Sequence, residues 1–152
     1  MMLRGFKEVH KDHKKKNYPT ILPVRGDVGS AGYDFYSKET VTIQPGEQHL
    51  FWTDVKAYMQ QDEVLHVHIR SSVGVKKGLV LSNSVAVVDS SYFSNPSNDG
   101  NIGICLKNTT DVLVKVLEDE RIAQGVFSKY LVADEDNALH AERSGGFGSS
   151  GK

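Results

Sequence analysis

Residues 64–70 read VLHVHIR, and apolar and polar side chains alternate from Leu65 onward. Because successive side chains of a β-strand point to opposite faces of a sheet, Leu65, Val67 and Ile69 share one face, and His66, His68 and Arg70 share the other. The segment therefore predicts a β-strand whose apolar face lies in a protein core.

Comparable short apolar runs recur along the chain. They lie at residues 41–43, 79–81, 85–88, 102–106, 112–117 and 122–130. Turn-forming stretches separate them, such as QPG at 44–46 and SNPSNDG at 94–100. Short strands between regular turns are typical of an all-β sandwich or barrel. The best helix candidate, residues 72–77, is only one or two turns long, so we predict an all-β single domain.

The composition limits the classes of partner. The chain has 152 residues, of which 39% are hydrophobic and 24% charged, and its formal net charge is −1. This size suits about one domain with an ordinary core. The absence of a basic excess argues against nucleic-acid binding. The local basic stretch 14–16 (KKK) is interpreted as a solvated loop.

The compartment is predicted from the cysteine content and from the N-terminus. Cys105 is the only cysteine, which excludes an internal disulfide and suits a reducing compartment. It lies in an apolar run and is expected to be an inert strand residue. No apolar stretch approaches the ~18 residues of a membrane helix, and the polar N-terminus does not resemble a signal peptide. We therefore predict a cytoplasmic protein with no membrane association.

His66 and His68 raise the question of a metal site, because both are expected on one strand face. No third ligand accompanies them at a useful spacing, and the chain has no paired Cys-x-x-Cys. We interpret them as surface or interface histidines.

The C-terminal segment 143–151 (RSGGFGSSG) combines groups suited to a nucleotide. Glycines let backbone N–H groups approach an anion, serine hydroxyls add donors, and Arg143 can hold phosphate oxygens. Phe147 offers a flat face for a base. The composition is also that of a plain Gly/Ser-rich tail, so a nucleotide-closing flap and a tail both remain open on these residues alone.

Two further segments place acids, cations and hydroxyls beside predicted strands. Asp34 lies between two aromatic residues, where a strand would bury it unless a partner is present; an ordinary turn aspartate is the alternative. Arg70, Ser71 and Ser72 end one strand and open the helical turn, which indicates either a phosphate site or a simple N-cap.

Residues 83–92 and 119–124 are the last two of five segments that carry candidate functional residues. The first stretch predicts a hairpin that offers backbone groups and the Asn83 amide to a base edge, with Asp89 as a candidate general base. A purely structural hairpin closed by Asp89 is the alternative. In the second stretch, Gln124 lies inside an otherwise apolar strand, where a buried amide needs a partner.

Taken together and in this order, the five segments resemble the ordered motifs of the trimeric dUTPase family, from Ala31 to Gly151, about four-fifths of the chain. The resemblance implies a jelly-roll-like β-barrel over residues 1–141, including the basic N-terminal segment. It implies a flexible arm over residues 142–152 that carries the fifth motif. It also implies a homotrimer with shared active sites, in which each arm closes over a neighbour's pocket.

The resemblance implies hydrolysis of dUTP to dUMP and pyrophosphate, with Asp89 activating water for attack on the α-phosphorus. Substrate binding is implied for Arg70, Ser71, Ser72, Asn83, Ala86, Tyr92, Gln124, Arg143, Phe147, Gly148 and Ser149, with Asp34 in a supporting role near the phosphates. Within this set, Asn83 and the Ala86 backbone read uracil, and Tyr92 packs against the deoxyribose and excludes a 2′-hydroxyl. Mg²⁺ is implied as a cofactor held through the triphosphate, without a direct protein ligand.

The chain departs from the common family pattern at three places. Ser91 stands where a second acid is usual, residues 93–99 lengthen the link to the next strand, and Ala86 replaces a glycine. The first two departures resemble the variant found in dUTPases of Gram-positive bacteria and their phages. An alanine at position 86 preserves the backbone contact unless its φ is positive.

Two alternatives are considered. The related dCTP deaminases carry an arginine and a catalytic glutamate where this chain has Val75 and Cys105, so water activation against cytosine lacks an agent here. A regulatory nucleotide-binding protein with a protein partner is the other alternative, with the basic N-terminal segment and residues 93–99 as candidate surfaces.

Overall fold

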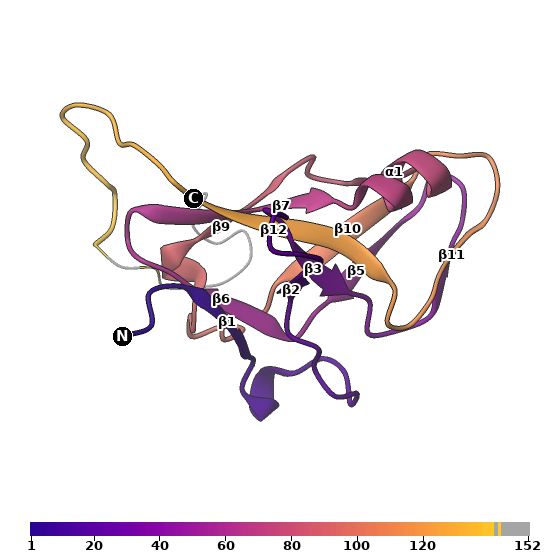
Figure 1. Cartoon of the computed structure of the whole chain (residues 1–152), viewed down its shortest axis with the longest axis horizontal. Coiled ribbons are helices and arrows are strands. Elements are labelled where there is room, and N and C mark those ends of the chain that lie inside the picture. The colour runs from indigo at the N-terminus through magenta and orange to yellow at the C-terminus, as the bar shows by residue number, and fades with distance from the viewer. Residues whose placement is uncertain (142, 144–152) are drawn as a thin grey trace.

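A five-stranded antiparallel sheet dominates the computed structural model, which describes residues 1–141 and 143 (Figure 1). Its strand order is β2-β3-β12-β7-β9. The strands are β2 (Val24–Arg25), β3 (Tyr33–Tyr36), β12 (Arg121–Lys129), β7 (Glu63–Ile69) and β9 (Ala86–Asp89). The alternating segment 64–70 thus forms β7, near the middle of this sheet.

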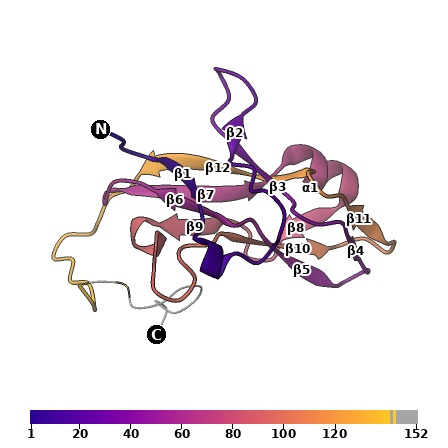
Figure 2. The same cartoon turned by 90° about the horizontal axis from the view of Figure 1, so that it is seen from below.

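Smaller antiparallel sheets complete the fold. A three-stranded sheet runs in the order β5 (Gln48–Trp52), β10 (Gly103–Asn108), β8 (Leu79–Leu81). Two strand pairs join β1 (Gly5–Glu8) to β6 (Val55–Tyr58) and β4 (Val41–Ile43) to β11 (Val114–Val116). Seen from below, β12 and β7 lie in one layer and β10 and β5 in the other (Figure 2).

The core lies between these layers. Leu65 and Val67 of β7 are fully buried and belong to one apolar cluster with Ile104 and Leu106 of β10. His66 on the opposite face of β7 is only half-buried. The burial therefore follows the alternation of the sequence, because one face of each layer packs against the other and the second face does not. The prediction of an all-β, jelly-roll-like fold is confirmed.

The predicted helix is present as α1 (Ser71–Lys77), and it begins one residue earlier than expected. Arg70 occupies the N-cap position without a side-chain capping hydrogen bond, so the interpretation of Ser71 or Ser72 as the cap is wrong. Short 3-10 turns lie at η1 (Lys11–His13) and η2 (Ser90–Tyr92). Among the described residues, no helix has the length and apolar character needed to cross a membrane.

The basic N-terminal stretch is more constrained than a solvated loop, and that prediction is corrected here. The backbone N–H groups of Lys15 and Lys16 donate to the Asp54 carboxylate at 2.8 and 3.1 Å. Lys38 forms a buried ion pair with the same carboxylate at 3.0 Å. The stretch is held because a buried carboxylate must have its lone pairs satisfied.

Candidate active site

Asp89 and Tyr92 lie where β9 ends. Asp89 is the last residue of β9, opposite Val64 of β7, and its side chain is 52% exposed. The 3-10 turn η2 follows at once and turns the chain inward, so that Tyr92 is buried. A water-accessible carboxylate beside a buried aromatic ring is suited to act as a general base.

The Tyr92 hydroxyl is held from two sides. It donates to the backbone oxygen of Asn101 at 2.6 Å and accepts from the Asn98 side-chain amide at 2.8 Å. Burial raises the pKa of the Tyr92 phenol above its ordinary value, against the opposing effects of Asn98 and Arg143. The hydroxyl therefore stays neutral, and the ring has a defined position.

Arg143, the described residue of the fifth motif, lies against this pair. Its Nη1 is 3.3 Å from Oδ2 of Asp89 and 3.5 Å from Oγ of Ser91. Its guanidinium also lies over the Tyr92 ring, 5.1 Å from the ring centre. The start of the fifth motif and the third motif thus meet within one chain. Phe147, Gly148 and Ser149, the other predicted residues of the arm, lie outside the described residues.

A second group of predicted residues lies at the other end of β7. Arg70 follows the last residue of β7, and its backbone N–H donates to Ile122 of β12 at 3.2 Å. Its Nη1 donates to the Ser72 hydroxyl at 2.5 Å, and Ser71 is exposed beside it. A guanidinium and two hydroxyls are thereby gathered at the start of α1, a donor set that suits phosphate oxygens.

Gln124 and Asp34 belong to this second group. They are directly opposite each other in the β12–β3 register, and Gln124 is opposite His68 on its other side. Arg121 pairs with Asp34 at 3.5 Å, which supplies the partner that a half-buried carboxylate between aromatic residues requires.

Two residues that sequence reasoning missed shape this group. Arg121 was not among the predicted site residues. Gly32 packs so closely on Gln124 that a Cβ there would lie 2.3 Å from the Gln124 amide oxygen. A glycine within the first motif was the available signal for this close approach.

Asn83 and Ala86 lie on the link from β8 to β9. The prediction of a hairpin here is wrong, because β8 pairs with β10 and β9 pairs with β7, so the link crosses between two sheets. Asn83 is exposed in the turn, where its carbonyl accepts from Val85 at 2.7 Å. Ala86 opens β9 opposite Val67 and has no positive φ. The alanine therefore satisfies the condition under which it can replace the usual glycine.

The two groups are far apart within one chain. Asp89 is paired with Val64 at one end of β7, whereas Arg70 follows the other end. Six residues of a strand span about 20 Å. Within one chain, the candidate base Asp89 and the phosphate donors at residues 70–72 therefore lie too far apart to act on the same phosphate group.

A metal centre would need several ligating side chains gathered at one point. Residues 1–141 and 143 contain no group of three or more His, Cys, Asp or Glu side chains placed to hold a metal ion. His66 and His68 have ring centres 6.3 Å apart, and both are half-buried.

The sequence and the fold are similar to those of known dUTPases. The family model for dUTPase matches residues 19–151. The deoxyuridine 5′-triphosphate nucleotidohydrolase of Lactococcus lactis is 49% identical over 152 residues, covering 99% of both chains. The Streptococcus mutans dUTPase structure aligns with a TM-score of 0.75 at 45% identity, covering 86% of this chain and 98% of that one.

A structure of the Staphylococcus bacteriophage 80alpha dUTPase shares the fold. Its TM-score is 0.71 at 23% identity, and the alignment covers 94% of this chain and 92% of the phage chain. The family match spans most of the chain and includes every predicted site residue, from Asp34 to Ser149. The chain therefore belongs to the dUTPase family.

Proposed function

We propose that this chain hydrolyses dUTP to dUMP and pyrophosphate, with Asp89 as the general base. The Asp89 carboxylate accepts a proton from water as the water oxygen attacks the α-phosphorus. The bond from the α-phosphorus to the bridging oxygen breaks, pyrophosphate leaves with that oxygen, and the proton on Asp89 then passes to solvent. The half-exposed position of Asp89 at the end of β9 supports this role.

The substrate-binding roles follow the two groups of residues. Asn83 and the backbone of Ala86 hold the uracil edge, and Tyr92 packs against the deoxyribose. Fixed donors and acceptors reject cytosine because a mismatch leaves buried polar groups unpaired. Arg70, Ser71, Ser72 and Gln124 hold the phosphates, with Asp34 fixed nearby through Arg121. When bound to the triphosphate, Mg²⁺ neutralises phosphate charge and favours departure of pyrophosphate.

We further propose a homotrimer with active sites shared between subunits. The observation that carries this is the separation along β7 of Asp89 from Arg70, about 20 Å of strand. A triphosphate held at the start of α1 cannot reach the base of the same chain without a large rearrangement. A neighbouring subunit that supplies the missing half removes this difficulty, and in a ring each subunit can serve the next. The arm, with Phe147, Gly148 and Ser149, then closes over a pocket and excludes water.

The test of the base is an Asp89→Asn variant. We expect turnover of dUTP to fall by about a thousandfold or more, with binding of a non-hydrolysable dUTP analogue retained. Asp111→Asn, an exposed loop carboxylate, is the matched control and should keep full activity. Normal turnover by Asp89→Asn would remove Asp89 from the mechanism.

The test of shared sites is subunit mixing. Asp89→Asn and Arg70→Ala chains are each expected to be nearly inactive. Hybrids formed by co-expression should regain activity, because some sites then combine an intact Asp89 with an intact Arg70 from another subunit. No recovery in hybrids of verified composition, or a monomer by light scattering, would contradict the shared site.

A further inference from the structure

The lengthened link 93–99 and Gly100, which follows it, form a closed loop organised by a buried asparagine. The Asn95 side-chain amide donates to the backbone oxygen of Tyr92 and to Oδ1 of Asn98, both at 2.8 Å. Its own Oδ1 accepts from the backbone N–H groups of Ser97 and Asn98 at 3.0 and 3.2 Å. This 93–100 loop is therefore a folded unit built directly onto Tyr92.

The close of the 93–100 loop requires glycine. Gly100 has a φ of +84°, and a Cβ there would lie 2.9 Å from the backbone oxygen of Tyr92 and 2.9 Å from the backbone nitrogen of Ser94. Both neighbours are backbone atoms, which cannot swing aside. The loop is thus packed against the residue from which it starts.

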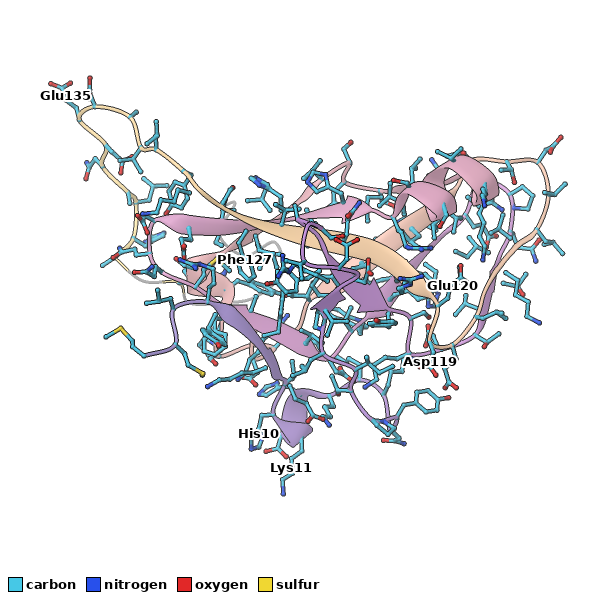
Figure 3. All side chains as sticks on the ribbon, in the orientation of Figure 1. His10, Lys11, Asp119, Glu120, Phe127 and Glu135 are labelled. Atoms are coloured by element: carbon cyan, nitrogen blue, oxygen red, sulfur yellow. The ribbon has the colours of Figure 1, made fainter. Side chains whose placement is uncertain are left out.

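Contacts with two outside residues, Lys56 and His10, fix the 93–100 loop to the body of the protein. The Asp99 carboxylate accepts from Lys56 Nζ of β6 and from the backbone N–H of His10, each at 2.8 Å. His10 lies beside η1, where the N-terminal segment turns (Figure 3). Lys56 also donates to the Ser94 hydroxyl at 2.9 Å and lies over the Phe93 ring. These contacts anchor the loop at both of its ends.

Within this loop, Asn98 faces Tyr92 in an orientation that its other bonds dictate. Its Oδ1 accepts from the backbone N–H of Gly100 at 3.0 Å and from the Asn95 amide. The oxygen is therefore committed to the loop, and the nitrogen is left to donate to the Tyr92 hydroxyl at 2.8 Å. The Tyr92 hydroxyl thus accepts one hydrogen bond, from Asn98, and donates one, to the backbone oxygen of Asn101. These two bonds hold the hydroxyl end of the ring in place.

We propose that Asn98 is a positioning residue for sugar selectivity, acting through the Tyr92 hydroxyl. This inference rests on the proposed function, in which the Tyr92 ring lies against the deoxyribose of dUTP. The Tyr92 ring can exclude a 2′-hydroxyl only if it stays close to the sugar. A small displacement of the ring away from the sugar would make room for the extra oxygen atom. The 93–100 loop, through Asn98, supplies the restraint that keeps the Tyr92 ring in place. The loop then contributes to substrate selection within this protein and is not only a surface for a protein partner.

The test compares variants that break this one bond. Asn98→Asp keeps the acceptor oxygen that the loop needs and replaces the donor with an acceptor. Tyr92→Phe removes the hydroxyl and leaves all loop bonds in place. Ser97→Ala is the matched control, because its hydroxyl bonds only to Asn95 within the loop. Each protein is titrated with α,β-imido dUTP and α,β-imido UTP by calorimetry, and turnover of dUTP and UTP is measured separately.

For Asn98→Asp and for Tyr92→Phe we expect the preference for the deoxy analogue to fall about fivefold, the effect of one ordinary hydrogen bond. The fall should come from tighter UTP analogue binding. For Asn98→Asp, kcat for dUTP should stay nearly unchanged. Adding Asn98→Asp to Tyr92→Phe should cause no further change, because the shared bond is already absent. Ser97→Ala should keep the preference of the unaltered protein.

Three results would overturn the proposal. These are an unchanged preference in Asn98→Asp and Tyr92→Phe, an equal fall in Ser97→Ala, and fully additive effects in the double variant. If the unaltered protein binds the dUTP analogue but does not turn dUTP over, the proposed catalysis is wrong. The preference for the dUTP analogue over the UTP analogue still tests the role of Asn98 in that case. If it binds neither analogue, the proposed substrate and this inference fall together.

Discussion

Nη1 of Arg143 lies 3.3 Å from Oδ2 of Asp89, although 54 positions separate the two residues in the chain. The Arg143 side chain is only 9% exposed in this contact. A cation therefore lies beside the candidate general base, whose carboxylate stays half-exposed, when no nucleotide phosphate competes for it. Triphosphate oxygens are stronger partners for a guanidinium than one carboxylate, so substrate is expected to draw Arg143 away and free Asp89.

Removal of the residues after Glu142 tests the role of the arm. We expect dUTP turnover to fall about a hundredfold, because site closure and the Arg143 cation are both lost. The melting temperature should hardly change, since the strands and the core precede this point. The measurements are steady-state kinetics and thermal unfolding on the same preparations. Full activity in the truncated protein would exclude an arm that closes the site.

Gly32→Ala tests the placement of Gln124. The new methyl group would lie 2.3 Å from the Gln124 amide oxygen and 3.0 Å from its Cβ, so the glutamine must move. We expect kcat/KM for dUTP to fall about tenfold, as a phosphate contact of about 1.4 kcal/mol is lost. Gly26→Ala, where a Cβ meets only the Ser30 hydroxyl at 3.9 Å, is the matched control. Equal activity of the two variants would show that Gln124 does not contact the substrate.

Lys38→Met tests the buried ion pair with Asp54. Both side chains are almost fully buried, so removing the cation leaves a buried carboxylate without its charge partner. We expect the free energy of unfolding to fall by about 3–5 kcal/mol at pH 7, measured by urea denaturation. The exposed Lys76→Met should change it by less than about 0.5 kcal/mol. If Lys38→Met lowered the free energy of unfolding by a similarly small amount, the remaining hydrogen bonds to Asp54 would be enough to stabilise its buried carboxylate.

The same pair predicts a pH dependence of the unfolding free energy. Burial would raise the pKa of Asp54, but hydrogen bonds from Lys15, Asn101 and Lys38 lower it below its ordinary value. This stabilisation is complete above the unfolded pKa of about 3.9 and is lost as the pH falls through the lower folded value. Lys38→Met raises the folded pKa, so its deficit should shrink from pH 7 to pH 4. A constant deficit over this range would contradict the assignment.

Tyr92→Ala is expected to weaken the fold as well as the sugar selectivity. The ring is 7% exposed, and its hydroxyl holds both Asn101 and Asn98. Truncation of a buried aromatic side chain costs about 3–5 kcal/mol, so the melting temperature should fall clearly. Discrimination against UTP should also relax in the fraction that remains folded. Unaltered selectivity in that fraction would remove Tyr92 from its assigned place against the sugar.

Strong local patterns allowed much of the fold to be predicted. The runs 41–43 and 79–81 form β4 and β8 with the predicted bounds, and β7 is shifted by one residue. The strands β1, β2, β5 and β6 were not predicted. Polar residues interrupt them, and β1 exists because Gly5–Glu8 pairs with Tyr58–Val55, about fifty residues away. Such pairing is set by tertiary contacts that local periodicity does not carry.

The sequence by itself determined the family, the motif order and the chemical types at the site, because those depend on residue identity and spacing. Only the tertiary structure decided which of these residues meet. It joined Arg143 to Asp89, placed Gln124 opposite Asp34, and set Asp89 and Arg70 at opposite ends of β7. It also turned the 93–100 loop inward onto Tyr92 through Asn98. These relations arise from strand register and buried hydrogen bonds, which join residues distant in the chain at a definite geometry.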